Sequence, residues 1–168
     1  MDTNFRAVNQ QIKTLFLKSK NENRSLSQLI DKYLVVQESD KRQNAEVSTP
    51  YKLRQEMLNI VPKDFWTKRN KVLEPCCGKG GFLLDIYSRF YKGLEGEIPN
   101  GDERKKVILE DLIFWADINP LNIYICKLLL NPNGFYKINY YLGDTLDLDD
   151  GKFNLVVCNP PYNMSGNI

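Results

Sequence analysis

From residue 70 to residue 158 the chain alternates short apolar stretches with stretches of helical periodicity. The apolar stretches lie at 71–74, 112–117, 135–142 and 153–158, and runs with helical spacing follow the first two. Strands that alternate with helices predict a parallel sheet with helices on both faces. We therefore expect an α/β domain built on a parallel sheet.

The last predicted strand is continuously apolar at Leu155, Val156 and Val157. Such a run indicates a strand buried on both faces of its sheet. The sequence ends soon after it, and natural sheets avoid open edges. We therefore expect either that the sequence is part of a longer chain or that something else covers this strand.

The first third of the sequence predicts helices. Apolar residues recur every three or four positions from Phe5 to Phe16, and Ser25 to Gln28 fits a capping box at the start of a second helix. A polar stretch follows at 37–48, and then Thr49-Pro50 predicts an N-cap followed by proline at the first helical position. We divide the chain into an N-terminal helical region, residues 1–44, and an α/β domain, residues 45–168.

Composition excludes several kinds of protein. The 168 residues suit one domain, and the lack of histidine excludes a Ser-His-Asp triad or an imidazole base. No apolar run approaches the roughly 20 residues that span a bilayer, and the N-terminus lacks a signal-peptide core. The four cysteines fit neither a zinc site nor a disulfide framework, so we expect a cytoplasmic protein without a metal. The net charge of +2 neither demands nor excludes nucleic acid.

The motif Asn159-Pro160-Pro161-Tyr162 directly follows the last predicted strand. Ligands bind at the carboxyl ends of strands in open α/β sheets, and two prolines stiffen the turn there. Such a turn could present the Asn159 amide oxygen and the Pro160 carbonyl oxygen to one exocyclic amine, while the Tyr162 ring stacks on a base. The structural alternative is that Asn-Pro-Pro is simply a good turn with a packed tyrosine.

Three other predicted strands also end in residues that could bind a ligand. A glycine turn follows Glu74, and it matches neither a P-loop nor the GxGxxG pattern. Asp117 ends the second strand, where a carboxylate can accept ribose hydroxyls, although it could also serve only as a helix-entry residue. Asp144 follows the third strand and could receive an adenine amine or belong to a solvated acidic loop.

Together these motifs resemble the adenine-N6 DNA methyltransferases that use S-adenosylmethionine, in the motif order of the gamma class. The resemblance runs from residue 45 to residue 166 and rests on STPY at 48–51, LEPCCGKGGFL at 73–83, WADINP at 115–120, LGDTL at 142–146 and NPPY at 159–162. It implies a Rossmann-like class I methyltransferase fold. NPPY alone is shared with glutamine and some RNA methyltransferases, and STPY ahead of the glycine turn favours DNA adenine.

The resemblance also implies roles for individual residues. Asn159 and Pro160, with Pro161, would hold the target amine and Tyr162 would stack on the flipped base. Asp117 would hold the ribose of S-adenosylmethionine and Asp144 its adenine. The remaining residues implied in the cofactor site are Thr49, Pro50, Glu74, Cys76, Gly78, Gly80, Ile118 and Thr145.

The sequence departs from the family in length. The family sheet has seven strands, and the four predicted here would be neighbours in the order 3-2-1-4. The partners implied are DNA and a missing C-terminal half or target-recognition subunit, with no membrane. The alternatives to adenine methylation are a truncated, non-catalytic remnant or subunit that binds the cofactor, and a methyltransferase acting on protein glutamine or RNA.

Overall fold

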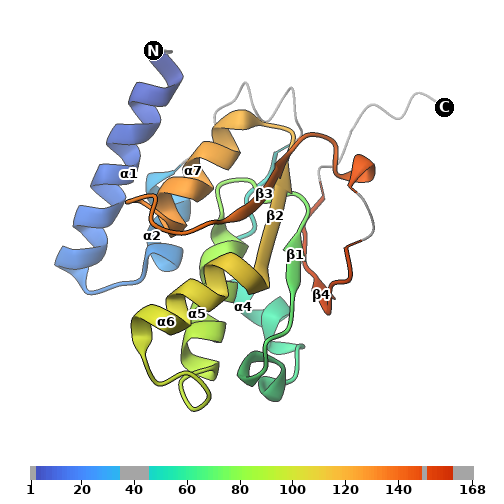
Figure 1. The fold of residues 1–168 in the computed structure, drawn as a ribbon. Coiled ribbons are helices and arrows are strands. Elements are labelled where there is room, and N and C mark those ends of the chain that lie inside the picture. The colour runs from blue at the N-terminus through green and yellow to red at the C-terminus, as the bar shows by residue number, and fades with distance from the viewer. Residues whose placement is uncertain (1–2, 35–45, 149–150, 161–168) are drawn as a thin grey trace.

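A computed structural model describes residues 3–34, 46–148 and 151–160 of the chain. These residues form a parallel sheet of four strands in the order β3-β2-β1-β4 (Figure 1). The strands are β1 (Val72–Glu74), β2 (Ile113–Asp117), β3 (Asn139–Leu142) and β4 (Leu155–Val156). The predicted strand order is confirmed, and all four carboxyl ends lie at one edge of the sheet.

The outer strands are shorter than the sequence predicts. β3 occupies only the last four residues of the predicted strand at 135–142, and β4 only two of the six residues at 153–158. Within the described residues β4 is the edge strand beside β1, and its Val156 is 55% exposed. The expectation that Leu155 to Val157 is buried on both faces is therefore wrong, because only Val157 of these three residues is buried.

The N-terminal helices are α1 (Thr3–Glu22) and α2 (Leu26–Tyr33). The predicted capping box of α2 is confirmed, because the Ser25 side chain accepts from the Gln28 backbone N–H and the Gln28 side chain accepts from the Ser25 N–H. α4 (Tyr51–Asn59) begins one residue later than predicted, with Pro50 in the N-cap position. Thr49 therefore does not cap this helix.

Helices also connect the strands. α5 (Gly81–Gly93) follows β1, and α7 (Pro120–Leu130) follows β2, with the Asn119 side chain capping α7 as it accepts from the Leu121 N–H. After α5 ends at Gly93, α6 (Gly101–Val107) begins and runs into a π-helical turn (Ile108–Leu112). Short 3₁₀ turns lie at Lys63–Thr67 and Thr145–Asp147.

One apolar core joins the N-terminal helices to the sheet. Leu15 and Ile30 of α1 and α2 belong to the same buried cluster as Phe90 of α5 and Ile113 of β2. The other face of the sheet borders an open cavity of about 560 Å³, to which no α-helix of the described residues contributes. The prediction that helices cover both faces of the sheet is thus confirmed for one face only. No helix in the described parts of the chain is long and apolar enough to cross a membrane.

Candidate cofactor and catalytic site

The turn after β1 brings the glycines of the predicted motif to the edge of the sheet. The Cys77 N–H donates to the Ala116 carbonyl of β2 at 2.9 Å, which fixes the turn against the neighbouring strand. Gly78 and Gly80 have φ angles of +50° and +89°, a region that L side chains rarely adopt. Gly80 is the N-cap of α5, so the strand turns directly into that helix.

Asp117 at the end of β2 holds this turn in place. Its Oδ2 accepts from the Gly78 N–H at 2.9 Å and from Asn122 Nδ2 at 3.2 Å, and its Oδ1 accepts from the Asn119 N–H at 2.8 Å. The carboxylate is only 9% exposed. Each carboxylate oxygen can accept about two hydrogen bonds, so Oδ1 keeps capacity for a ligand hydroxyl.

A cavity of about 720 Å³ opens at the carboxyl ends of the strands. It lies between the glycine turn, the end of β2, the turn after β3 and the segment after β4. The volume suits a small ligand of nucleoside size. Its lining includes eight residues that the sequence assigned to the site, namely Cys76, Gly78, Asp117, Ile118, Asp144, Thr145, Asn159 and Pro160.

A smaller cavity, about 50 Å³, adjoins the large one. Thr49 and Glu74 line this smaller cavity, and Cys76, Gly78 and Asn159 line both. The remaining predicted residues are elsewhere: Pro50 and Gly80 line neither cavity, and Pro161 and Tyr162 lie outside the described residues.

Glu74 is the last residue of β1, and its carboxyl group is buried beside the small cavity. The side chain is 2% exposed, and its Oε2 is buried with no hydrogen-bond partner in the described structure. Burial raises the pKa of Glu74 well above its ordinary value, Cys126 and Asp117 raise it further, and the Arg54 cation opposes this. An unpaired buried acceptor beside a cavity is a group that a ligand's N–H or O–H could satisfy.

The cysteines around the turn are free thiols. Burial raises the pKa of Cys76 to about 11, and it also raises the pKa values of Cys77 and Cys158. The thiolate is the reactive form of cysteine. These side chains are therefore poor nucleophiles at neutral pH and serve as small lining residues.

Sequence reasoning missed a polar network at the floor of the site. Lys79 Nζ donates to Asn122 Oδ1 at 2.9 Å and pairs with Glu46 Oε1 at 3.4 Å, while Asn122 Nδ2 donates to Glu46 Oε2 at 3.2 Å. Lys79 lies inside the glycine motif and Asn122 in the first turn of α7, so the positions of both residues pointed to the site from the sequence alone. Glu46 lies in a polar stretch that carried no such signal.

The charged residues of the large cavity are acidic. Glu46, Asp117 and Asp144 line it, and none of its described lining residues is basic. Lys79 pairs with Glu46, so Asp117 and Asp144 are the carboxylates that would repel a phosphate-bearing ligand and attract a cation. The site therefore favours a positively charged small molecule.

Asn159 follows β4 at the same edge of the sheet. Its Nδ2 donates to the Val47 carbonyl at 3.3 Å, which joins the segment after β4 to the segment before α4. This hydrogen bond orients the amide group, whose oxygen is its acceptor. The structure thus brings Asn159 and Pro160 to the wall of the cavity that Gly78 also lines.

Comparison with known proteins agrees with this geometry. The sequence model of the family described as N-6 DNA Methylase matches residues 27–167, most of the chain. The chain belongs to the N-6 DNA methylase family. The predicted Rossmann-like fold and the family resemblance are thereby confirmed.

Individual relatives of this N-6 DNA methylase chain are methylases of restriction systems. It is 29% identical over 132 residues to the methylase subunit of the type I restriction enzyme MjaVIII of Methanocaldococcus jannaschii, covering 75% of this chain and 21% of that protein. It is 28% identical over 120 residues to the type II restriction enzyme and methyltransferase RM.BcgI of Heyndrickxia coagulans, covering 68% and 17%. The chain thus spans about a fifth of the length of the curated relatives it matches.

A solved structure supports the fold. The modification subunit of a restriction enzyme from Vibrio vulnificus YJ016 matches with a TM-score of 0.54 and 22% identity, over 81% of this chain and 28% of that one. At this identity the match bears on the fold of the N-6 DNA methylase chain, and the roles of single residues rest on the geometry above.

Proposed function

We propose that this chain provides the cofactor-binding and catalytic wall of an S-adenosylmethionine-dependent adenine-N6 DNA methyltransferase. The observation that carries the proposal is the 720 Å³ cavity, where Asp117, Asp144 and Asn159 from the ends of three parallel strands meet. Membership of the N-6 DNA methylase family supports the same reaction.

The residues present fit S-adenosylmethionine. The large cavity is lined by carboxylates without a basic residue among its described lining, which suits a sulfonium cation better than a phosphorylated cofactor. In this proposal Asp117 accepts hydroxyls of the ribose, Asp144 contacts the adenine of the cofactor, and the unpaired Oε2 of Glu74 accepts from the cofactor's ammonium end. When bound, the cofactor supplies a methyl group activated by its sulfur.

The segment after β4 receives the target amine in this proposal. The amide oxygen of Asn159 and the carbonyl oxygen of Pro160 both accept, so together they can bind both hydrogens of one exocyclic amine. This draws the nitrogen toward tetrahedral geometry and makes its lone pair available. Acceptors already fixed in a stiff turn need little reorganisation during the reaction. Pro161 and the stacking role of Tyr162 complete the motif in the proposal.

The partners also belong to the proposal. DNA is the substrate, and an adenine must leave the duplex to reach a cavity of this kind. The curated relatives are about five times longer than the matched region, and one is named as a subunit of a type I restriction enzyme. This supports assigning the choice of DNA sequence to further polypeptide, either in the same chain or in a separate subunit.

The first test is cofactor binding by calorimetry. We expect the purified chain to bind S-adenosylmethionine and S-adenosylhomocysteine, with S-adenosylmethionine favoured at low salt because of its extra positive charge. NAD and ATP are the controls, since their phosphates should be repelled. Binding of ATP in preference to S-adenosylmethionine would contradict the proposal.

The second test is methyl transfer from the radiolabelled cofactor. Mixed-sequence DNA is compared with RNA and with a glutamine-containing peptide, and hydrolysed DNA is examined for N6-methyladenine. We expect label in DNA adenine. Cofactor binding without transfer to any substrate would favour the non-catalytic alternative, and label in RNA or peptide would favour the other methyltransferases.

A further inference from the structure

The small cavity beside Glu74 is bounded on one side by the start of α4, whose N-cap residue supplies no side-chain hydrogen bond. The N-cap position of α4 is Pro50, which offers no side-chain cap. The Tyr51 N–H, the first of α4, instead donates to Asp31 Oδ2 of α2 at 3.2 Å. Since unsatisfied N–H groups weaken a helix start, α2 supplies the acceptor that α4 lacks.

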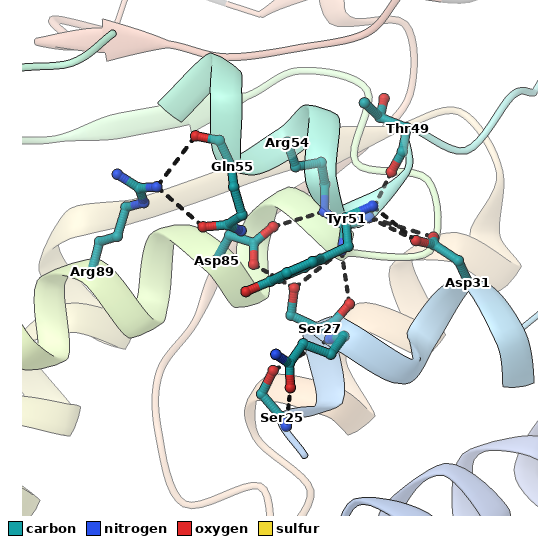
Figure 2. Close-up of polar contacts among 10 residues, drawn as sticks. Ser25, Ser27, Asp31, Thr49, Tyr51, Arg54, Gln55, Asp85 and Arg89 are labelled. Carbon is teal, nitrogen blue, oxygen red and sulfur yellow. Dashed lines mark hydrogen bonds and ion pairs between the residues drawn. The ribbon is translucent and has the colours of Figure 1, made fainter. Parts of the chain in front are cut away.

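Arg54 also holds the start of α4 in place. Its Nη1 donates to the Thr49 carbonyl at 2.6 Å and pairs with Asp31 Oδ2 at 3.2 Å. Thr49, which lines the small cavity beside Glu74, is therefore held by Arg54 through its backbone. Figure 2 shows Thr49, Tyr51 and Asp31 gathered around the end of the Arg54 side chain.

The remaining guanidinium donors anchor Arg54 to two other helices. Nε donates to Asp85 Oδ2 of α5 at 2.7 Å, and Nη2 donates to the Ser27 carbonyl of α2 at 2.8 Å and to its Oγ at 3.0 Å. The Ser27 hydroxyl donates to the other oxygen of Asp85 (Figure 2). Arg54 is only 2% exposed, so its charge relies on these partners rather than on water.

Gly81 provides the space for this arrangement. A Cβ atom at Gly81 would lie 2.8 Å from Arg54 Cζ, closer than such contacts occur. Gly81 belongs to the glycine motif that the family resemblance assigns to the cofactor. Its small size nevertheless makes room for the Arg54 guanidinium. The start of α5 and the start of α4 are thus packed together around one buried cation.

We infer that Asp31 and Arg54 are positioning residues that hold Thr49 and the start of α4 at the small cavity of the cofactor site, which makes α2 a working part of that site. This rests on the proposed function. The pair touches the cavity wall directly, because Asp31, Arg54, Thr49 and Gly81 all line the small cavity with Glu74. A binding site whose wall is fixed by such supporting contacts loses affinity when they loosen.

The decisive variant is Asp31→Asn, because Asp31 is the half-exposed partner, with 36% of its side chain accessible. The Arg54–Asp85 pair stays intact, so the chain should remain folded. We expect the affinity for S-adenosylhomocysteine, measured by calorimetry well below the melting temperature, to fall about tenfold, or about 1.4 kcal/mol.

Arg89→Gln is the matched control, because Arg89 ties the opposite end of α4 to α5. Arg89 Nη1 donates to the Leu58 carbonyl at 3.1 Å and Nη2 to Asn59 Oδ1 at 2.8 Å, and neither cavity at the sheet edge includes Arg89. Both variants should lower the melting temperature, but Arg89→Gln should leave cofactor affinity unchanged. Equal losses of affinity in the two variants, or no loss in Asp31→Asn, would overturn the inference.

Chemical rescue provides a second readout. In Arg54→Ala, added guanidinium chloride should restore affinity at concentrations where sodium chloride of the same ionic strength does not. If Arg54→Ala folds and keeps its full affinity without guanidinium, Arg54 is not a positioning residue. If Arg54→Ala does not fold, the comparison of Asp31→Asn with Arg89→Gln decides. If the unaltered chain binds no cofactor, the proposed function fails. If it binds and the variants bind equally, only this inference fails.

Discussion

The buried carboxylate of Glu74 should lower the free energy of unfolding of the protein without bound cofactor. The side chain is buried and one oxygen has no partner in the described structure, so its ionised form is poorly solvated. Glu74→Gln keeps the shape of the side chain and removes the charge. We therefore expect the variant to be more stable than the natural chain at neutral pH.

An unpaired buried neutral group costs about 1–3 kcal/mol and an unpaired charge costs more, and Glu74→Gln removes only this excess because the amide stays buried. Arg54 offsets part of this cost through its charge, so about 1–2 kcal/mol is expected. For a domain of this size that corresponds to a rise in melting temperature of about 2–8 °C.

The pH dependence has a definite sign. The folded-state pKa of Glu74 is raised above the ordinary value of 4.5, so the folded state binds its proton more tightly than the unfolded state does. The ionisation of Glu74 then lowers the stability of the folded state by nothing below the unfolded pKa. The loss of stability grows as the pH rises toward the folded pKa. The gain from Glu74→Gln should therefore be small in acid and largest at and above neutral pH.

Thermal unfolding from pH 4 to pH 8 measures this difference, with Glu56→Gln on the exposed side of α4 as the control. The control should show no gain that grows with pH. Calorimetry on the same variant should show weaker S-adenosylmethionine binding, since the proposed acceptor for the ammonium group has lost its charge. A difference in stability that does not change with pH, or a variant less stable at every pH, would refute the reasoning.

Three other predictions follow from the site. Asp117→Ala removes the acceptor for the Gly78 N–H as well as the proposed ribose acceptor, so calorimetry should show cofactor affinity reduced at least about tenfold; an unchanged affinity would remove Asp117 from the site. Asn159→Ala should abolish methyl transfer to DNA, followed by radiolabel, while cofactor binding persists; normal turnover would contradict its role. Gly80→Ala places a Cβ 3.0 Å from Cys126 Sγ at a φ of +89°, so thermal unfolding should show a loss of about 1–3 kcal/mol, and a neutral result would mean that the turn relaxes.

The sequence alone determined the order of the elements and the ends of the strands. Apolar strand patterns and turn residues are local signals, so the parallel sheet and the placement of Asp117, Asp144 and Asn159 at one edge followed from them. The capping box at Ser25 was equally local and is confirmed. The lengths of β3 and β4 were not predictable, because pairing with a neighbour rather than propensity ends a strand at the margin of a sheet.

Tertiary structure decided which residues support the site. Arg54 has no special context in the sequence, yet folding brings it between Asp31 and Asp85, which lie 23 and 31 residues away. Glu46 likewise reaches Asn122 across 76 residues. Partners so distant along the chain meet only when helices pack, and a buried charge is held there because water no longer solvates it. The sequence thus determined which functional side chains lie at the strand ends, while packing decided which charged residues hold those side chains in place.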